Sequence, residues 1–115
     1  MKILIATLAA AGMLTLFMVL FAASANAALD DARAQELMKK AGCVACHSVD
    51  KKVLGPAYKE IAQKRKGESD AVATLEKAVR NGSKGTYGQI PMPPNAKEKI
   101  SDADLHELAE WVLTR

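Results

Sequence analysis

The sequence contains few aromatic side chains, which make up 4% of its 115 residues. Both phenylalanines, Phe17 and Phe21, lie within residues 1–27, so that Tyr58, Tyr87 and Trp111 are the aromatic residues of the rest of the chain. A small domain buries a modest share of its surface and often needs a cross-link or a cofactor. The shortage of aromatic rings disfavours a core built around them, and it is compatible with a bound apolar group that takes their place.

A strong excess of charge of one sign is also missing. The formal net charge is +3 at pH 7, and the longest basic run is KRK at residues 64–66. Nucleic-acid-binding domains usually carry a clustered basic face, and this sequence has neither such a cluster nor basic residues interleaved with aromatic ones. There is no internal repeat, and the length suits one domain at most. Charge and length therefore predict a single domain that does not bind nucleic acid.

Residues 1–27 have the composition of an export signal. Lys2 is followed by the uncharged apolar run ILIATLAAAGMLTLFMVLFAA and then by the small residues Ala25 and Ala27. This order predicts a secretory signal peptide that is cleaved after Ala27. The apolar run is long for a signal, so that a retained membrane anchor is the alternative. Either route exports residues 28–115, and the periplasm is the expected compartment in a bacterial source.

Four stretches have the apolar spacing and terminal residues of helices, and none alternates for long enough to predict a strand. The sequence predicts an all-α domain with helices in residues 29–42, 56–67, 69–82 and 101–115. Gly42 is expected to end the first helix, and Pro56 to lie in the first turn of the second. Ser69 and Ser101 are expected to cap the N-termini of the third and fourth helices.

The two cysteines of the chain, Cys43 and Cys46, lie within the sequence CVACH. A disulfide between them would suit an oxidising compartment but gives no role to His47. A thioredoxin-like redox pair would follow a strand in a βαβ unit, which the sequence does not predict. A zinc site would have to add His106, with an unusual spacing and with two ligands adjacent in sequence at one tetrahedral ion.

The fourth interpretation of CVACH is the attachment motif of a c-type haem, and this is the interpretation that the sequence favours. The two thiols would add to the two vinyl groups of the porphyrin, which would place the next residue, His47, beneath the iron. Export agrees with this chemistry, because c-type attachment takes place outside the cytoplasm. We therefore expect one covalent haem c, with its iron, bound through Cys43, Cys46 and His47.

The second axial position of the iron decides what such a haem can do. The candidates are Met38, Met92, His106, a lysine or no protein ligand. Met38 is expected in the core, because it precedes Cys43 on the same predicted helix, and His106 is expected at the surface among charged neighbours. Met92 follows a glycine-rich stretch and is flanked by prolines. Glycine allows close backbone approach and proline stiffens a loop, which favours Met92 and leaves the other candidates open.

Several segments resemble the short bacterial monohaem class I cytochromes c, small soluble proteins that pass electrons to nitrite reductases and terminal oxidases. These segments are GCVACH, LGPAYKEIA, NGSKGTYGQIPMPPN and LAEWVL, and the resemblance covers residues 29–114 in order. It implies a small fold of about four helices around one haem. It also implies thioether bonds from Cys43 and Cys46, with His47 as the proximal and Met92 as the distal ligand of the iron.

The resemblance further implies roles for neighbours of the two ligands. The carbonyl group of Pro56 would accept a hydrogen bond from His47 and fix the imidazole. The side-chain amide of Asn95 would lie near the Met92 sulfur. Such contacts tune a metal centre.

The surroundings of the haem propionates are expected to differ from those in many relatives. These relatives have a tryptophan at the position of Tyr87, and its ring donates to a propionate. The Tyr87 hydroxyl is expected to donate instead. An arginine that relatives often carry near the position of Ala78, facing the same propionate, is missing. Arg80 is a candidate to replace it, but it is expected instead to be a solvated residue at a helix end.

With both axial positions filled, the expected function is one-electron transfer and not catalysis. The resemblance implies a monomeric periplasmic carrier between a respiratory donor complex and a nitrite reductase or terminal oxidase. Lysines such as Lys39, Lys51 and Lys52 would surround the exposed haem edge and steer acidic partners. Two alternatives remain. One is a haem subunit of a respiratory complex anchored by residues 3–23, and the other is a five-coordinate haem enzyme or gas sensor.

Overall fold

The computed structural model describes residues 28–115, and the predicted signal peptide therefore lies outside the described residues. The elements in chain order are α1 (Asp31–Ala41), the 3-10 helix η1 (Cys43–Ala45), α2 (Tyr58–Lys64), α3 (Ala71–Asn81) and α4 (Asp102–Leu113). Residues 28–115 form no strand beyond two isolated bridges. None of the helices in this range is long and apolar enough to cross a bilayer. The prediction of an all-α domain is confirmed.

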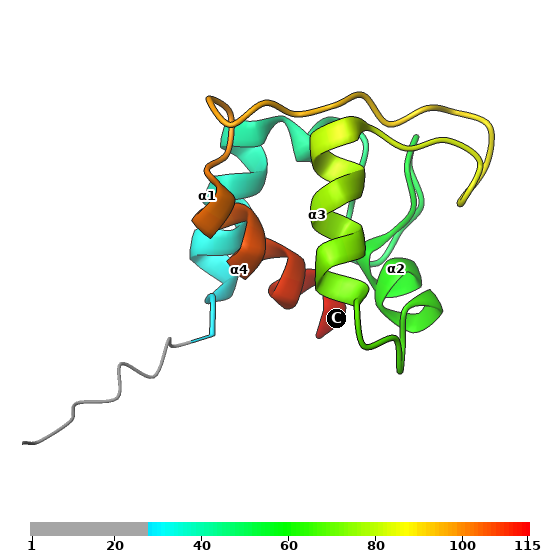
Figure 1. Ribbon diagram of the computed structural model, residues 1–115, viewed down its shortest axis with the longest axis horizontal. Helices are drawn as coiled ribbons and strands as arrows, with labels where there is room; N and C mark the ends of the chain where they lie inside the picture. The colour runs from blue at the N-terminus through cyan, green and yellow to red at the C-terminus, as the bar shows by residue number, and fades with distance from the viewer. Residues whose placement is uncertain (1–27) are drawn as a thin grey trace, which may run out of the picture.

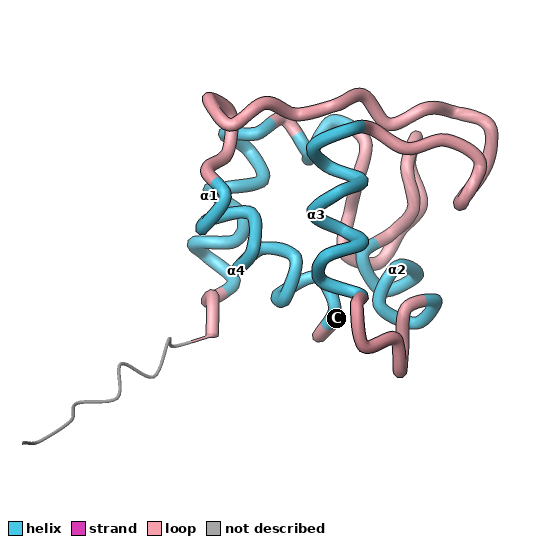
Figure 2. Tube along the Cα trace, viewed as in Figure 1, coloured by secondary structure: helices cyan, strands magenta, loops and turns pink. Residues whose placement is uncertain are grey.

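Helix α4 is the central element, because it packs against α1, α2 and α3 (Figure 1). Two long loops complete the fold, and both are drawn in pink in Figure 2. One runs through residues 46–57 between η1 and α2, and the other through residues 82–101 between α3 and α4. The second loop extends away from the end of α3 and returns along the top of the view to the start of α4 (Figure 1). The helices thus form a scaffold from which the two loops project.

Local capping explains where α1 and α4 begin and where α1 ends. The Asp30 carboxylate accepts a hydrogen bond of 2.7 Å from the backbone N–H of Arg33. Gly42 ends α1 in the left-handed conformation, with φ of 79°, which glycine adopts without steric cost. The Ser101 hydroxyl accepts a bond of 3.1 Å from the N–H of Asp104 at the start of α4. The predicted roles of Gly42 and Ser101 are confirmed.

Helix α2 begins at Tyr58, two residues later than Pro56, where the sequence analysis placed its first turn. Ala57 keeps an extended backbone, with φ of −64° and ψ of 149°. The reason is a contact outside the helix, because the N–H of Tyr58 donates to the Ser48 carbonyl over 2.9 Å. The extended residues before α2 are therefore used to join the helix to the loop at 46–57.

Helix α3 also begins differently from the prediction, since its N-cap is Asp70 and not Ser69. The Asp70 side chain makes no capping hydrogen bond. A backbone turn replaces it, in which the N–H of Ala71 donates to the Glu68 carbonyl over 3.4 Å. The backbone thus supplies the contact that a serine side chain was expected to make.

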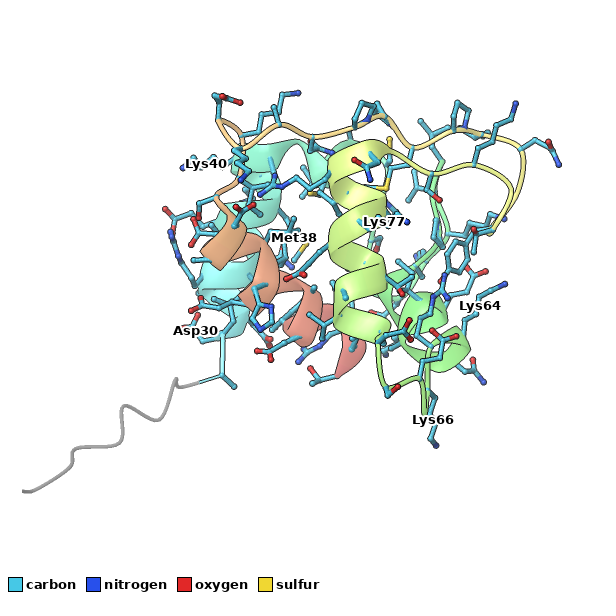
Figure 3. The ribbon with its side chains drawn as sticks, in the orientation of Figure 1. Asp30, Met38, Lys40, Lys64, Lys66 and Lys77 are labelled. Atoms are coloured by element: carbon cyan, nitrogen blue, oxygen red, sulfur yellow. The ribbon has the colours of Figure 1, made fainter. Side chains whose placement is uncertain are left out.

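The core collects apolar side chains from α1, α2 and α4, and partly buried residues of α3 pack against it. Met38 on α1 is 1% exposed, which confirms its predicted place in the core (Figure 3). Trp111 on α4 is 4% exposed, and its ring meets that of Tyr58 edge to face, with the centroids 6.0 Å apart. The other large members are Leu37, Ile61, Ile100, Leu105, Leu108 and Val112. The core lies on the side of α4 that also borders the cavity described next.

Candidate cofactor site

A cavity of about 230 Å³ lies between the two long loops and helices α2, α3 and α4. Its lining is mainly apolar and includes Ile61, Leu75, Val79, Leu105, Leu108 and Val112. The groups with ligand chemistry come from the loops. Cys43, Cys46 and His47 line it from the first part of the chain, and Met92 lines it from the loop between α3 and α4. The predicted attachment and ligand residues are therefore brought to one cavity, which Pro56 and Tyr87 also line and Asn95 does not.

The imidazole of His47 has a fixed orientation and a fixed tautomer. Its Nδ1 lies 2.7 Å from the carbonyl oxygen of Pro56. A carbonyl oxygen can only accept, so Nδ1 carries the proton and donates, which leaves Nε2 with a lone pair for a metal. The ring of Tyr58 stacks on the imidazole with centroids 5.4 Å apart. Nitrogen ligation by a histidine of this kind is usually supported by such a second hydrogen bond.

The two cysteines lie in and just after η1, and each is partly buried as a free thiol. The turn is tight, because the N–H groups of Cys46 and His47 both donate to the Cys43 carbonyl, over 3.1 and 3.0 Å. Burial raises the pKa of the Cys43 thiol, which keeps it protonated at neutral pH. One short segment thus presents two thiols and an imidazole to the same cavity.

Met92 is held by a pair of backbone hydrogen bonds. Its N–H donates to the Ser83 carbonyl over 2.7 Å, and the N–H of Ser83 donates to the Met92 carbonyl over 3.1 Å. Gly82, just before this pair, has a φ of 79°, and a Cβ atom there would lie 2.7 Å from the Met92 carbonyl oxygen. Glycine is therefore needed for the loop to fold back on itself and carry Met92 to the cavity.

Asn95 connects the part of the loop after Met92 to helix α3. Its backbone N–H donates to the Val79 carbonyl over 2.7 Å. Its side-chain Nδ2 donates to the Pro93 carbonyl over 3.4 Å. The predicted site residue Asn95 thus lies beside the proline segment that carries Met92.

Two tyrosine hydroxyls at the cavity are buried, and neither meets the geometry of a hydrogen bond within residues 28–115, although the Arg65 guanidinium lies close to that of Tyr87. They belong to Tyr58 and Tyr87, and both residues line the cavity. Burial raises the pKa of each hydroxyl, and for Tyr87 the nearby Arg65 guanidinium offsets part of that increase. A buried hydroxyl without a partner is costly, by about 1–3 kcal/mol. Both hydroxyls are therefore available to a polar group of a bound molecule.

Two lysines bind backbone carbonyls of the loop between α3 and α4. The sequence did not indicate these contacts. Lys52, which is exposed, donates through Nζ to the Tyr87 carbonyl over 3.5 Å. Lys64 donates to the Thr86 carbonyl over 3.2 Å, and its Nζ lies 5.0 Å from the centre of the Tyr87 ring. The acceptors are backbone carbonyls distant in sequence, so no local pattern could have found these contacts.

The structure keeps His106 away from the cysteines. His106 is an exposed residue of α4, and its Nδ1 lies 2.7 Å from a carboxylate oxygen of Glu76 on α3. Among residues 28–115, no three His, Cys, Asp or Glu side chains gather as a metal site would require. The expectation of a surface histidine is confirmed. The expectation that Arg80 is solvated is wrong, because its side chain is 18% exposed and hydrogen-bonded.

A sequence model of the family described as "Cytochrome c" matches residues 32–115. The chain belongs to the cytochrome c family. Cytochrome c-551 of Pseudomonas aeruginosa is 51% identical over 79 residues, which are 69% of this chain and 73% of that protein. Cytochrome c-552 of Nitrosomonas europaea is 48% identical over 103 residues, which are 89% of this chain and 98% of that protein.

Solved structures of cytochromes c have the same fold. The crystal structure of wild-type Nitrosomonas europaea cytochrome c552 superposes with a TM-score of 0.65 at 50% identity, and covers 70% of this chain and 96% of that one. A class 1 cytochrome, MtoD from Sideroxydans lithotrophicus, gives 0.64 at 34% identity, with 76% and 97% covered. These likenesses confirm the resemblance to small monohaem class I cytochromes c and the predicted fold.

Cytochromes c are electron-transfer proteins that carry covalently attached haem c with its iron, so the predicted cofactor and the absence of enzymatic activity are confirmed at the level of the family. The structure of this cytochrome c fits that group. The cavity is apolar where a porphyrin would pack, and two thiols and an imidazole with an unprotonated Nε2 line it. The unpartnered hydroxyls of Tyr58 and Tyr87 supply polar atoms suited to charged substituents.

Proposed function

We propose that this cytochrome c is a periplasmic one-electron carrier whose haem is bound through Cys43 and Cys46, with His47 and Met92 as axial ligands. The observation that carries the proposal is that His47 and Met92 line one cavity while hydrogen bonds hold the loop of each. Residues 1–27 would direct export and be removed. The mature protein would be a monomer.

The protein groups have separable roles in this proposal. When bound, the haem supplies an iron that changes by one electron between Fe(III) and Fe(II). His47 offers Nε2 to the metal, and the Pro56 carbonyl holds the Nδ1–H and so orients the imidazole. Met92 offers a soft thioether, which favours the ferrous state and raises the potential. With both positions occupied by protein atoms, oxygen and peroxide have no site at which to bind.

The cavity walls would limit structural change between the two oxidation states. The Tyr87 hydroxyl would donate to a haem propionate, and its burial without a partner within residues 28–115 supports this role. The Asn95 amide would lie near the Met92 sulfur, a role supported by its bond to the carbonyl of Pro93, the residue after Met92. Rigid surroundings keep the reorganisation small, which favours rapid electron transfer.

Partner binding would take place where apolar residues of η1 and of the two loops are exposed. Val44, Leu54 and Ile90 are 46%, 53% and 61% exposed, which suits brief contact with a respiratory donor complex and with a nitrite reductase or terminal oxidase. The exposed Lys39 and Lys51 would steer acidic partners. Steering predicts that the rate with a partner falls as ionic strength rises, and a rate insensitive to salt contradicts it.

The test is the visible spectrum of the exported protein in its ferric and ferrous states. A weak far-red band of the ferric protein reports methionine bound to iron. We expect Met92→Ala to remove the band and the control Met38→Leu to retain it, because Met38 is a core residue. A high-spin spectrum without the band in the native protein would show that Met92 is not the ligand. Determination of the mature N-terminus separates a carrier that begins at Ala28 from a subunit anchored through residues 3–23.

A further inference from the structure

We propose that Arg80 is a positioning residue for the axial methionine, because it holds the Met92 loop, residues 82–100, closed against α3 and α4. The inference rests on the proposed function, since it presumes that Met92 binds the iron. Arg80 belongs to the last turn of α3 and does not line the cavity. It would therefore act on the iron only through the loop.

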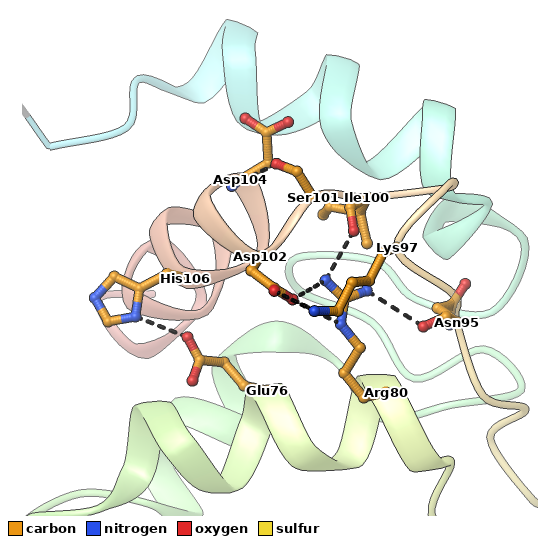
Figure 4. A network of polar contacts seen from close by, with 9 residues as sticks. All are labelled: Glu76, Arg80, Asn95, Lys97, Ile100, Ser101, Asp102, Asp104 and His106. Carbon is orange, nitrogen blue, oxygen red and sulfur yellow. Dashed lines mark hydrogen bonds and ion pairs between the residues drawn. The ribbon is translucent and has the colours of Figure 1, made fainter.

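The guanidinium group of Arg80 binds three parts of the chain at once (Figure 4). Nη1 donates to the Asn95 carbonyl over 3.3 Å, and Nη2 donates to the Ile100 carbonyl over 2.8 Å. Nη2 and Nε also donate to one carboxylate oxygen of Asp102, over 2.8 and 3.3 Å. One side chain thus joins α3 to the loop and to the first residue of α4.

The acceptors lie at the two ends of the segment by which the loop returns to α4. Asn95 follows Met92 by three residues, and its own N–H is bonded to the carbonyl of Val79, the neighbour of Arg80. Ile100 is 2% exposed and directly precedes the N-cap of α4. Arg80 therefore holds the returning segment at both ends, while the Ser83–Met92 pair holds the part that leads outward.

Arginine is suited to this position by its shape and by its surroundings. The Arg80 side chain is 18% exposed, so water competes weakly for its donors. Its planar fork spreads donors over three nitrogens and so reaches two carbonyls and a carboxylate together, whereas the three donors of a lysine share one nitrogen atom. Lys97 also binds Asp102, over 2.7 Å, and together with Arg80 it lowers the pKa of that carboxyl group. Asp102 is therefore ionised at neutral pH and orients the guanidinium.

The contacts of Arg80 are important to the loop because most residues of the segment 84–99 are exposed. Ile90, two residues before Met92, is 61% exposed. Local opening of such segments has a low free energy, which rises with each hydrogen bond that must break. Loss of the Arg80 bonds would raise the population of open loop, in which Met92 has left the iron and an added ligand can replace it.

A second contact between the same helices provides a matched control. Glu76 on α3 binds His106 on α4 over 2.7 Å, and this pair lies apart from the loop (Figure 4). Glu76→Gln weakens an α3–α4 contact, as Arg80→Gln does, but leaves Asn95 and Ile100 with their donor. Comparison of the two variants separates an effect on the loop from a general effect on the packing of the two helices.

The experiment is an imidazole titration of the ferric protein with its haem attached, followed through loss of the far-red band. We expect Arg80→Gln to raise the apparent imidazole affinity about tenfold, which corresponds to about 1.4 kcal/mol. Arg80→Lys should give a smaller increase, because it retains the charge but not the fork. Glu76→Gln should change the affinity by less than about twofold, as is usual for an exposed ion pair.

The outcomes separate this inference from the proposed function. Absence of the band in the native protein would refute Met92 ligation itself. If the band is present and Arg80→Gln binds imidazole as tightly as the native protein, the inference is overturned. An equal increase in Arg80→Gln and Glu76→Gln also overturns it, because the role of Arg80 would then be general stability.

A milder variant covers the case in which Arg80→Gln does not fold. Asp102→Asn removes the charge that orients the guanidinium, whereas Lys97→Gln removes only the other partner of Asp102, an exposed lysine. We expect a raised imidazole affinity in Asp102→Asn and a native affinity in Lys97→Gln. A native affinity in both variants contradicts the inference.

Discussion

A Cβ atom placed on Gly55 would lie 2.6 Å from Cε1 of His47 and 3.0 Å from its Nδ1. The same Nδ1 donates to the Pro56 carbonyl over 2.7 Å. The imidazole therefore occupies the space that a side chain at position 55 would need. A hydrogen bond fixes the ring on another side. Two adjacent backbone positions together determine the direction in which Nε2 points.

The first prediction concerns Gly55→Ala. The added methyl group would push the imidazole, at a cost of about 1–3 kcal/mol in the free energy of unfolding. It should also shift the visible spectrum and the potential, because the bond to Pro56 would lengthen. Denaturant unfolding and potentiometry would measure both.

Gly67→Ala is a suitable control for that experiment. Gly67 has a φ of 83°. A Cβ atom built there would meet no described atom within 4 Å, apart from those of the adjacent residues. This substitution should lower stability through backbone strain and leave the spectrum unchanged. Equal spectra for both variants would contradict the role given to Gly55.

The second prediction concerns Gly82→Ala at the start of the Met92 loop. Gly82 combines φ of 79° with ψ of 170°, a conformation that is almost confined to glycine, and its Cβ would contact the Met92 carbonyl oxygen at 2.7 Å. The paired bonds between Ser83 and Met92 should therefore break. We expect the far-red band to weaken at a lower denaturant concentration than that at which the helices unfold. Coincident loss of band and helix would argue against a separate effect on the loop.

The third prediction concerns pH. The hydrogen bond to Glu76 raises the pKa of His106 above its ordinary value of 6.5, with smaller contributions from Glu110 and Glu107. A raised pKa in the folded state means that the stabilising contribution is complete below the unfolded pKa and is lost as pH rises through the folded one. The native protein should therefore exceed Glu76→Gln in stability most clearly between about pH 5 and 6.5.

Proton NMR of the His106 ring measures this directly. Its pKa should fall in Glu76→Gln, and the difference in stability between native protein and variant should vanish at higher pH. In the background His106→Gln, the pH dependence of that difference should be absent. An unchanged ring pKa in Glu76→Gln would mean that the pair does not form in solution.

The fourth prediction concerns Trp111, whose Nε1 donates to an Asp31 carboxylate oxygen over 2.9 Å. Trp111→Phe keeps an aromatic ring in the core but loses this donor and part of the buried area. We expect a loss of about 1–3 kcal/mol in the free energy of unfolding. A double-mutant cycle with Asp31→Ala, which removes the acceptor, should show a coupling of about 1 kcal/mol. Additive losses would show that the hydrogen bond contributes nothing.

The parts of the fold that the sequence predicts well are those determined by near neighbours. Gly42 ends α1 and Ser101 begins α4 through contacts within a few residues, so their patterns could be recognised. The CVACH motif is local in the same sense, because one turn presents all three of its reactive groups. The starts of α2 and α3 were misplaced where other backbone bonds decided them, such as the bond between Tyr58 and Ser48.

Contacts between distant residues explain what the sequence could not predict about the site. Arg80 resembles any arginine at an exposed helix end, and its acceptors lie 15 to 22 positions further along the chain. Lys52 similarly bonds to a carbonyl 35 positions away. Only the packing of α3 on α4 and the path of the long loop bring these groups together.

One oxygen of Asp31 accepts hydrogen bonds from both Trp111 and Arg115, over 2.9 and 3.0 Å and across 80 and 84 positions of sequence. These two hydrogen bonds join the first helix, α1, to the last helix, α4, and to the C-terminal residue of the described chain. Fraying, which usually starts at loose terminal segments, is resisted on both sides. Local opening is then left to segments between the helices, of which the loop of residues 82–100 is the longest and much exposed. The segment that presents Met92 therefore depends on its own contacts and not on those that join the ends of the domain.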